Sequence, residues 1–333
     1  MARLILFEPT YRRLQAEIDA AAAGIELLLM GADGVISLNG APVSVDEAQP
    51  NAAWFSQDLF ASAAARDVWI SCLKAENLKW AQSSAAGFDH PVFGDLVRKG
   101  ATLTTSHGQA VGMAEYVIAG VLDHFQRAGE RRAAQAAGTW TRVPFREVNG
   151  TTWLIIGYGA IGQGAAKTAK ALGATVIGVR RDQSAHESAD RIVPLGQVMA
   201  ELPGADVVVL SVPLTAETKH LVNASFVAAM KPGSVLVNVG RGGLVDEPAL
   251  LAGLDAGKPE HAVLDVFETE PLPAASPFWA HPRVALTPHA AGISNGSGAR
   301  NETLFVENLR RFAAGEPLLN AARPEDVLAG REA

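Results

Sequence analysis

Short runs of apolar residues recur through the first hundred positions of the chain, and segments compatible with helices or loops separate them. The runs occupy residues 4–7, 25–29, 53–56, 78–82 and 101–104. Alternation of short apolar runs with helical segments is typical of parallel sheets whose strands are joined by crossovers. The pattern therefore predicts a small parallel α/β unit at the start of the chain.

A long helix is predicted next, over residues 112–127. Its apolar residues recur at every fourth position and lie on one face: Met113, Val117, Val121 and Phe125. A segment rich in Gly, Thr, Trp and Pro follows at 138–144 and predicts a loop. Later strand-like runs, each preceded by a helix-compatible stretch, lie at 207–211, 235–239, 262–265 and 284–286. They predict a second doubly wound sheet.

The stretch from 153 to 181 combines an apolar strand, a glycine-rich turn, a helix and a second strand. Gly157, Gly159 and Gly162 form a GxGxxG pattern in the turn. The first glycine permits the tight turn, the second lets the backbone approach a pyrophosphate, and the third brings helix and strand together. We therefore predict a dinucleotide-binding βαβ unit, with Ala160 and Ile161 at the helix end that contacts the cofactor.

The end of the second strand of this unit indicates which dinucleotide is bound. NAD-binding units place Asp or Glu about 20 residues after the glycines, where the carboxylate holds the ribose hydroxyls. This chain has Arg180 and Arg181 there. Two guanidiniums suit a 2′-phosphate, so NADP(H) is the preferred cofactor and NAD(H) a possible one. The alternative is a pair of solvated surface arginines, and the neighbouring Asp182 keeps that alternative open.

A last helix near 302–314 follows the second sheet and is expected to return to the first unit. The predicted fold class is thus α/β with two doubly wound parallel-sheet domains. A dinucleotide-binding Rossmann domain, residues 107–289, is inserted in a smaller, flavodoxin-like substrate domain. The substrate domain is discontinuous, with residues 1–106 and 290–333.

Composition narrows the class of protein. Of 333 residues 48% are hydrophobic and 19% charged, and the formal net charge is −7, as in ordinary globular proteins. Because the chain has no long Lys/Arg run and no apolar run near the roughly 20 residues of a membrane span, we expect neither a nucleic-acid nor a membrane partner.

The single Cys72 fits a reducing compartment, so we predict a cytoplasmic protein. The histidines lack metal-ligand spacing, and no metal site is predicted.

Three ionisable side chains follow later strands of the second domain, where ligands of open α/β sheets collect. They are Arg241 in NVGRGGLVD, Glu270 in DVFETEP and His289 in TPHAAG. An arginine flanked by glycines can hold a carboxylate bidentately. A histidine can donate a proton to a ketone oxygen, and a carboxylate can orient its ring. Together they are the groups needed to reduce a 2-keto acid by hydride transfer.

These motifs, with GYGAIG at 157–162 and SVPLTAETKHLVN at 211–223, resemble the D-isomer-specific 2-hydroxyacid dehydrogenase family, most strongly over 112–292. The resemblance implies that Arg241 binds substrate, His289 is the acid/base and Glu270 is its partner. It further assigns Pro213, Asp265 and His289 to the cofactor site. SAAGFD at 84–89 resembles the loop whose backbone amides receive the substrate carboxylate, a role that falls to Ala86 and Gly87. The family's usual homodimer, built on the helix at 112–127, is also implied.

Arg180 resembles the NADPH-preferring glyoxylate/hydroxypyruvate reductase branch of the family. We therefore predict an NADPH-dependent reductase of glyoxylate, hydroxypyruvate or a similar small 2-ketoacid, with the D-2-hydroxyacid as product. One alternative is an NAD-linked dehydrogenase of the phosphoglycerate, lactate or phosphite type. Another is a dinucleotide-sensing corepressor that binds partner peptides, because such relatives resemble the enzymes at the three catalytic positions too.

Overall fold

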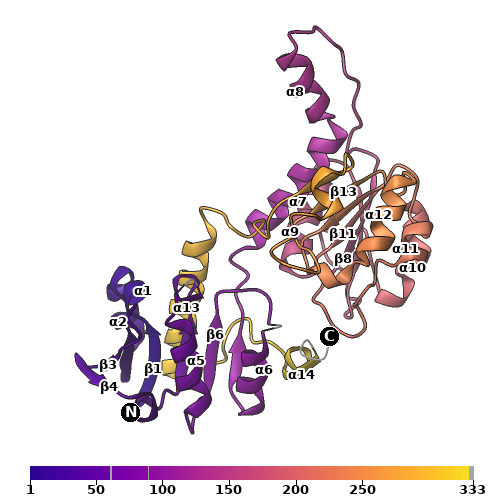
Figure 1. Cartoon of the computed structure of the whole chain (residues 1–333). Helices are drawn as coiled ribbons and strands as arrows, with labels where there is room; N and C mark the ends of the chain where they lie inside the picture. Colours follow the sequence, from indigo (N-terminus) through magenta and orange to yellow (C-terminus); the bar gives the residue numbers. More distant parts are fainter. Residues whose placement is uncertain (61, 89, 330–333) are drawn as a thin grey trace. The chain divides into compact units, whose positions relative to one another are not determined.

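The computed structural model describes residues 1–60, 62–88 and 90–329. The chain forms two compact units, Met1–Gln109 with Ser294–Ala333, and Ala110–Ile293. Each unit is built on one seven-stranded sheet with helices packed on it (Figure 1). The predicted class, two α/β domains with doubly wound sheets, is confirmed.

The sheet of the first unit has the strand order β4-β3-β2-β1-β5-β6-β7. Its five parallel strands follow the flavodoxin-like order and are β1 (Ala2–Phe7), β2 (Ile25–Met30), β5 (Ala52–Phe55), β6 (Trp80–Ser83) and β7 (Thr102–Thr104). Two antiparallel edge strands, β3 (Ile36–Leu38) and β4 (Ala41–Val43), were not predicted. Asn39 and Gly40 join them, both with positive φ, as a two-residue hairpin turn requires.

Eight helices of the described residues belong to the first unit. They are α1 (Glu8–Arg13), α2 (Gln15–Ala21), α3 (Val45–Ala48), α4 (Gln57–Phe60), α5 (Ala65–Lys74), α6 (Pro91–Arg98), α13 (Ser297–Ala314) and α14 (Pro324–Ala329). The returning helix α13 packs on α2, and its Phe305 stacks on Trp54 of β5 with ring centroids 3.7 Å apart. Trp54, Phe55 and Trp80 are buried, as a core role requires, and so is Cys72.

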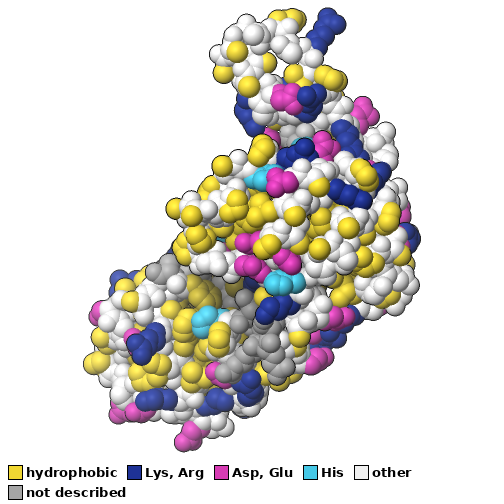
Figure 2. All heavy atoms as spheres, turned by 45° about the vertical axis from the view of Figure 1, so that its right-hand side comes forward, with side chains coloured by type: hydrophobic (Ala, Val, Ile, Leu, Met, Phe, Trp, Pro, Cys, Tyr) yellow, Lys and Arg dark blue, Asp and Glu magenta, His cyan; other side chains and the backbone are white. Residues whose placement is uncertain are grey.

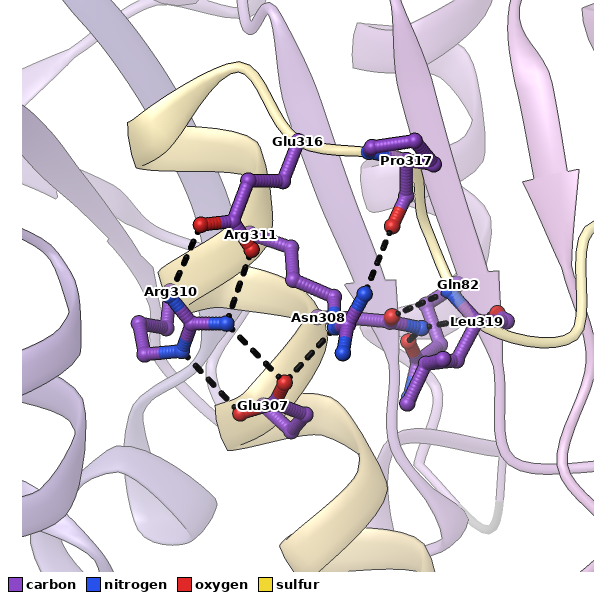
Figure 3. Close-up of polar contacts among 8 residues, drawn as sticks. All are labelled: Gln82, Glu307, Asn308, Arg310, Arg311, Glu316, Pro317 and Leu319. Atoms are coloured by element: carbon purple, nitrogen blue, oxygen red, sulfur yellow. Dashed lines mark hydrogen bonds and ion pairs between the residues drawn. The ribbon is translucent and has the colours of Figure 1, made fainter.

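Asn308 ties α13 to the sheet (Figure 3). Its Nδ2 donates to Gln82 Oε1 of β6 at 2.8 Å and to the carbonyl of Leu319 at 3.1 Å, and its Oδ1 accepts from the N–H of Leu319 at 2.8 Å. A buried side-chain amide stabilises the fold when its oxygen and its nitrogen both have hydrogen-bond partners, and it destabilises the fold when they have none. The contact therefore fixes α13 against β6.

The sheet of the second unit has the order β10-β9-β8-β11-β12-β13-β14, and all of its strands are parallel. The strands are β8 (Thr152–Ile156), β9 (Thr175–Val179), β10 (Arg191–Val193), β11 (Val207–Leu210), β12 (Val235–Asn238), β13 (His261–Leu264) and β14 (Val284–Leu286). The covering helices are α7 (Ala110–Phe125), α9 (Ala160–Ala171), α10 (Val198–Glu201), α11 (Ala224–Ala229) and α12 (Glu247–Asp255). The first six strands follow the Rossmann order.

The predicted long helix corresponds to α7, which starts two residues earlier and ends at Phe125. On its predicted inner face Val117, Val121 and Phe125 are buried, whereas Met113 is half-buried. None of the helices in the described parts of the chain is long and apolar enough to cross a membrane.

A helix that the sequence did not predict, α8 (Ala128–Ala136), projects from the second unit together with the loop that follows it (Figure 1). No residue of α8 is buried, and its sequence has no apolar stripe of the kind that predicts a helix packed on a core. Figure 2 shows hydrophobic and basic side chains exposed on this projection. The loop that follows α8 carries Trp140, which is 97% exposed, and Phe145, which is 50% exposed.

Candidate active site

The glycine-rich turn lies at the carboxyl end of β8, and two of its glycines are required by close contacts. Gly157 has φ +97°, and a Cβ there would lie 2.5 Å from the backbone of Ser211, just after β11. A Cβ on Gly162 would lie 2.3 Å from the carbonyl oxygen of Gly157. Contacts this short exclude any side chain, so the helix and both strands meet only because these positions are glycine.

Gly159 differs from its two neighbours because a Cβ there would meet no atom within 4 Å. It is the N-cap of α9, and no side chain caps the helix. Ala160 and Ile161, whose N–H groups are the first of α9, therefore follow a residue that has no side chain. Helix N-termini of this kind bind phosphate groups. The turn thus fits the pyrophosphate of a dinucleotide, and Pro213, after the adjacent β11, lies at the same edge of the sheet.

Arg180 follows β9, and the next loop folds around its guanidinium. Nε donates to the carbonyl of Asp182 at 2.5 Å, and Nη2 donates to the carbonyl and the hydroxyl of Ser184 at 2.6 and 2.7 Å. The Ser184 N–H and hydroxyl also bind the Asp182 carboxylate and lower its pKa. Arg181 is exposed next to this loop. The cationic loop is compatible with a 2′-phosphate, and equally with solvated arginines.

Arg241 follows β12 in a turn that packs on the neighbouring loop. Asn238 Nδ2 donates to the carbonyl of Arg241 at 3.0 Å, and the guanidinium Nη1 donates to the carbonyl of Gly240 at 2.8 Å. A Cβ on Gly242 would lie 1.8 Å from the carbonyl carbon of Phe267. Only glycine allows this approach, which joins the Arg241 turn to the loop that carries Glu270.

Glu270 and His289 are brought together by the structure. His289 Nδ1 lies 2.6 Å from Glu270 Oε2, and Glu270 Oε1 accepts the N–H of Phe267 at 3.0 Å. Since a carboxylate only accepts, Nδ1 carries a hydrogen in this contact, which leaves Nε2 directed away from the pair. The two side chains are 52% and 35% exposed, so the ring remains accessible.

The turn 287–291 that carries His289 is fixed by Asp265, which follows β13 and is 1% exposed. Asp265 Oδ1 accepts the N–H of Ala290 at 2.8 Å, and Oδ2 accepts the N–H of Ala291 at 3.0 Å. Its backbone carbonyl accepts the N–H of His289 at 2.8 Å. His289 itself has φ +52°, a left-handed conformation uncommon for residues other than glycine. The sequence predicted Asp265 only as a residue of the cofactor site, and did not predict that it fixes this turn.

Two hydroxyl groups extend the hydrogen-bond network of Asp265, and the sequence did not predict them either. Thr287 Oγ1 lies 2.5 Å from Asp265 Oδ1 and 2.7 Å from the hydroxyl of Tyr116 on α7. Because a carboxylate only accepts, the hydrogen of Thr287 goes to Asp265, and Tyr116 donates to Thr287. Burial raises the pKa of Tyr116, which keeps this donor protonated. No local signal in the sequence links residues 116 and 287.

Ala86 and Gly87 lie in the first unit, in the half-buried segment after β6. The start of this segment is held by the N–H of Ser84 on the carbonyl of Phe55 at 3.0 Å, and by the N–H of Ala85 on Ser83 Oγ at 3.1 Å. Within the described residues no group of three or more His, Cys, Asp or Glu side chains could hold a metal ion.

Comparison with known proteins places this geometry in a family. A model of the D-isomer specific 2-hydroxyacid dehydrogenase NAD binding domain matches residues 118–291. An (S)-sulfolactate dehydrogenase from Chromohalobacter salexigens is 37% identical over 217 residues, 63% of this chain and 69% of the relative. A glyoxylate/hydroxypyruvate reductase A from Klebsiella pneumoniae is 34% identical over 211 residues, 63% of this chain and 67% of the relative.

Solved structures agree with this placement. A D-isomer specific 2-hydroxyacid dehydrogenase from Xanthobacter autotrophicus, in complex with NADPH and MES, matches at a TM-score of 0.76 and 30% identity, over 98% of this chain and 99% of that one. An NADPH-dependent glyoxylate/hydroxypyruvate reductase from Sinorhizobium meliloti, in complex with NADP and sulfate, matches at 0.75 and 28%, over 99% and 100%. The chain therefore belongs to the D-isomer specific 2-hydroxyacid dehydrogenase family, which confirms the predicted oxidoreductase class and its nicotinamide dinucleotide cofactor.

Proposed function

We propose that this protein reduces a small 2-ketoacid, such as glyoxylate or hydroxypyruvate, to the D-2-hydroxyacid with NADPH. The observation that carries the proposal is the 2.6 Å contact between His289 Nδ1 and Glu270, in a loop packed against the turn of Arg241. These three groups supply a proton donor, its partner carboxylate and an anion-binding guanidinium at one sheet edge. Relatives with reductase names and NADP-bound structures support the same chemistry.

In the proposed mechanism each residue has one task. Arg241 binds the substrate carboxylate and carbonyl. The backbone amides of Ala86 and Gly87 are proposed as substrate-binding groups from the resemblance of their loop alone. The bound nicotinamide supplies the hydride. His289 donates the Nε2 proton to the ketone oxygen, while Glu270 holds Nδ1 and so keeps Nε2 directed at substrate. In the reverse direction His289 accepts the proton.

The acid/base assignment is tested with His289→Asn, which removes the titrating ring. We expect kcat for glyoxylate and hydroxypyruvate to fall by about 10² to 10⁴ while NADPH still binds, because a positioned general acid contributes that much. NADPH oxidation at 340 nm measures the rate, and fluorescence titration measures binding. His281→Asn is the matched control, since His281 pairs with Asp255 at the opposite edge of the same sheet. Near-normal kcat in His289→Asn would remove this residue from the mechanism.

The preference for NADPH is proposed from the place of Arg180 at the end of β9, beside Arg181. A carboxylate there would accept the ribose hydroxyls and repel a 2′-phosphate, and an arginine reverses both effects. Ser184, already within hydrogen-bond distance of the guanidinium, adds a hydroxyl to the same loop. The alternative of solvated surface arginines predicts no cofactor preference from this loop.

Arg180→Asp distinguishes these alternatives. We expect wild type to favour NADPH over NADH in kcat/KM, and the variant to lose on the order of 10- to 150-fold in NADPH affinity, as a lost charge-assisted hydrogen bond implies. Arg98→Asp on α6 makes the same change of charge in the first unit and should leave the ratio unchanged. A wild type that favours NADH, or a variant with an unaltered ratio, would show that Arg180 does not select the cofactor.

The role of the glycine-rich turn is tested by two alanine substitutions. Gly159→Ala places a methyl group in open space and should keep the melting temperature, yet weaken NADPH binding at least about tenfold, because backbone and pyrophosphate must approach closely. Gly162→Ala forces a methyl group against a backbone oxygen and should lower the melting temperature as well. Unchanged NADPH affinity in Gly159→Ala would contradict a pyrophosphate site at this turn.

Two other functions remain distinguishable by turnover. An NAD-linked D-2-hydroxyacid dehydrogenase would prefer NADH with the same panel of ketoacids. A dinucleotide-sensing corepressor would bind the cofactor and turn over none of them. Steady-state rates with both cofactors and a panel of 2-ketoacids therefore separate all three functions.

We further propose a homodimer built on α7, as the resemblance implied. The adjoining helix α8 buries no residue, and the loop after it exposes Trp140 and Phe145, which a second copy would cover. Light scattering should give about twice the chain mass of 34.9 kDa. A monomer at micromolar concentration would contradict the dimer.

A further inference from the structure

Buried polar atoms without a partner gather at one small cavity of the first unit. Among the described residues seven buried side-chain nitrogen or oxygen atoms have no hydrogen-bond partner, and three of them belong to residues that line this cavity. The three atoms are Trp54 Nε1, Ser84 Oγ and Asn301 Nδ2, on residues that are 1%, 3% and 2% exposed. Because nearly all buried polar groups in folded proteins have a partner, three at one place indicate a ligand site.

The cavity lies where the carboxyl ends of β5 and β6 meet the first turns of α13. Trp54 belongs to β5, Ser84 follows β6 directly, and Asn301 is in α13. The indole of Trp54 is stacked on Phe305 with the rings 7° from parallel, which holds the edge that carries Nε1. The site is therefore built from side chains that the core keeps in place.

The amide of Asn301 has a defined orientation. Ser106 Oγ accepts the N–H of Gly108 at 3.0 Å, so its own hydrogen is available for Asn301 Oδ1, with which it is in contact. The Asn301 oxygen is thereby used, and Nδ2 needs an acceptor. Asn308, two turns further along the same face of α13, has both amide groups partnered (Figure 3). The same residue type on one helix thus has all its partners at position 308, whereas at position 301, in the lining of the cavity, its Nδ2 has none.

The charges around the cavity define its ligand. Trp54 and Asn301 can only donate with their nitrogen atoms, so the ligand must accept at least two hydrogen bonds. At the rim Arg13 contacts Asp58 at 2.8 Å and Glu302 at 2.7 Å. Two carboxylates against one guanidinium leave a negative balance, which disfavours an anion. The volume of about 20 Å³ admits a single water molecule.

We infer that this cavity binds one structural water, which accepts hydrogen bonds from Trp54 Nε1 and Asn301 Nδ2 and shares one with Ser84 Oγ. The water links α13 and β5 to the start of the loop that carries Ala86 and Gly87. Under the proposed function, on which this part rests, that loop receives the substrate carboxylate. Trp54, Ser84 and Asn301 are then positioning residues for substrate binding.

Crystallography of the wild-type protein tests the site without reference to activity. We expect one density peak at about 2.7–3.2 Å from each of the three atoms, and no anomalous signal there after a bromide soak. An empty cavity, or an anomalous bromide peak, would overturn the water site. If the water is present and no 2-ketoacid is turned over, the proposed function fails while the site stands.

Trp54→Phe tests the positioning role, because it keeps a stacking ring and removes the donor. We expect the density to weaken and KM for the ketoacid to rise by about 2- to 10-fold, as one lost hydrogen bond implies, with kcat and the NADPH KM unchanged. Trp69→Phe removes another buried N–H without a partner, away from the cavity, and is the matched control. Ser84→Ala gives the same readout if Trp54→Phe folds poorly. Loss of the water with a wild-type KM would overturn the positioning role.

Discussion

The carboxylate of Asp265 is the constraint on which the arrangement of the candidate active site depends. It accepts backbone N–H groups from Ala290 and Ala291 and the hydroxyl of Thr287, and so closes the turn after β14. Inside that turn His289 takes a left-handed backbone conformation, which costs about 1–2 kcal/mol for an ordinary residue. Hydrogen bonds to the buried carboxylate offset this cost, since each hydrogen bond to a charged group contributes roughly 1.5–3 kcal/mol to stability. The conformation in turn brings Nδ1 within 2.6 Å of Glu270.

Close backbone approaches add the remaining groups to this framework. Gly242 lets the Arg241 turn touch the backbone of Phe267, whose N–H in turn binds Glu270. Gly157 lets the glycine-rich turn touch Ser211, which follows the adjacent strand β11. Parallel strands place all of these loops at one sheet edge, and glycine permits the contacts between them. The proposed chemistry thus depends on a few positions where a side chain would not fit.

Much of the fold and of the candidate site could be predicted from the sequence. Strands buried on both faces are continuous apolar runs, and ionisable residues directly after such runs lie at the carboxyl ends of the strands, where ligands bind. Other features carried no local signal. Helix α8 has no apolar stripe because it buries nothing, and the three-residue strands β3 and β4 are too short for a periodic pattern, although Asn39-Gly40 is a hairpin signal. Thr287 contacts both Asp265 and Tyr116, and only the fold brings these three positions together. The cofactor preference and the catalytic roles remain predictions.

The most direct measurement is the kinetics of Asp265→Asn with NADPH and a 2-ketoacid, beside Glu268→Gln as a control from the same loop. The amide cannot accept with both ends, so the turn loosens and the donor is misplaced. Misplacement by about 1 Å can cost on the order of 10²-fold in rate. The account predicts that kcat falls at least this far while NADPH affinity changes less than about tenfold. A near-normal kcat, with the loss confined to NADPH binding, would contradict the account and make Asp265 a cofactor ligand alone.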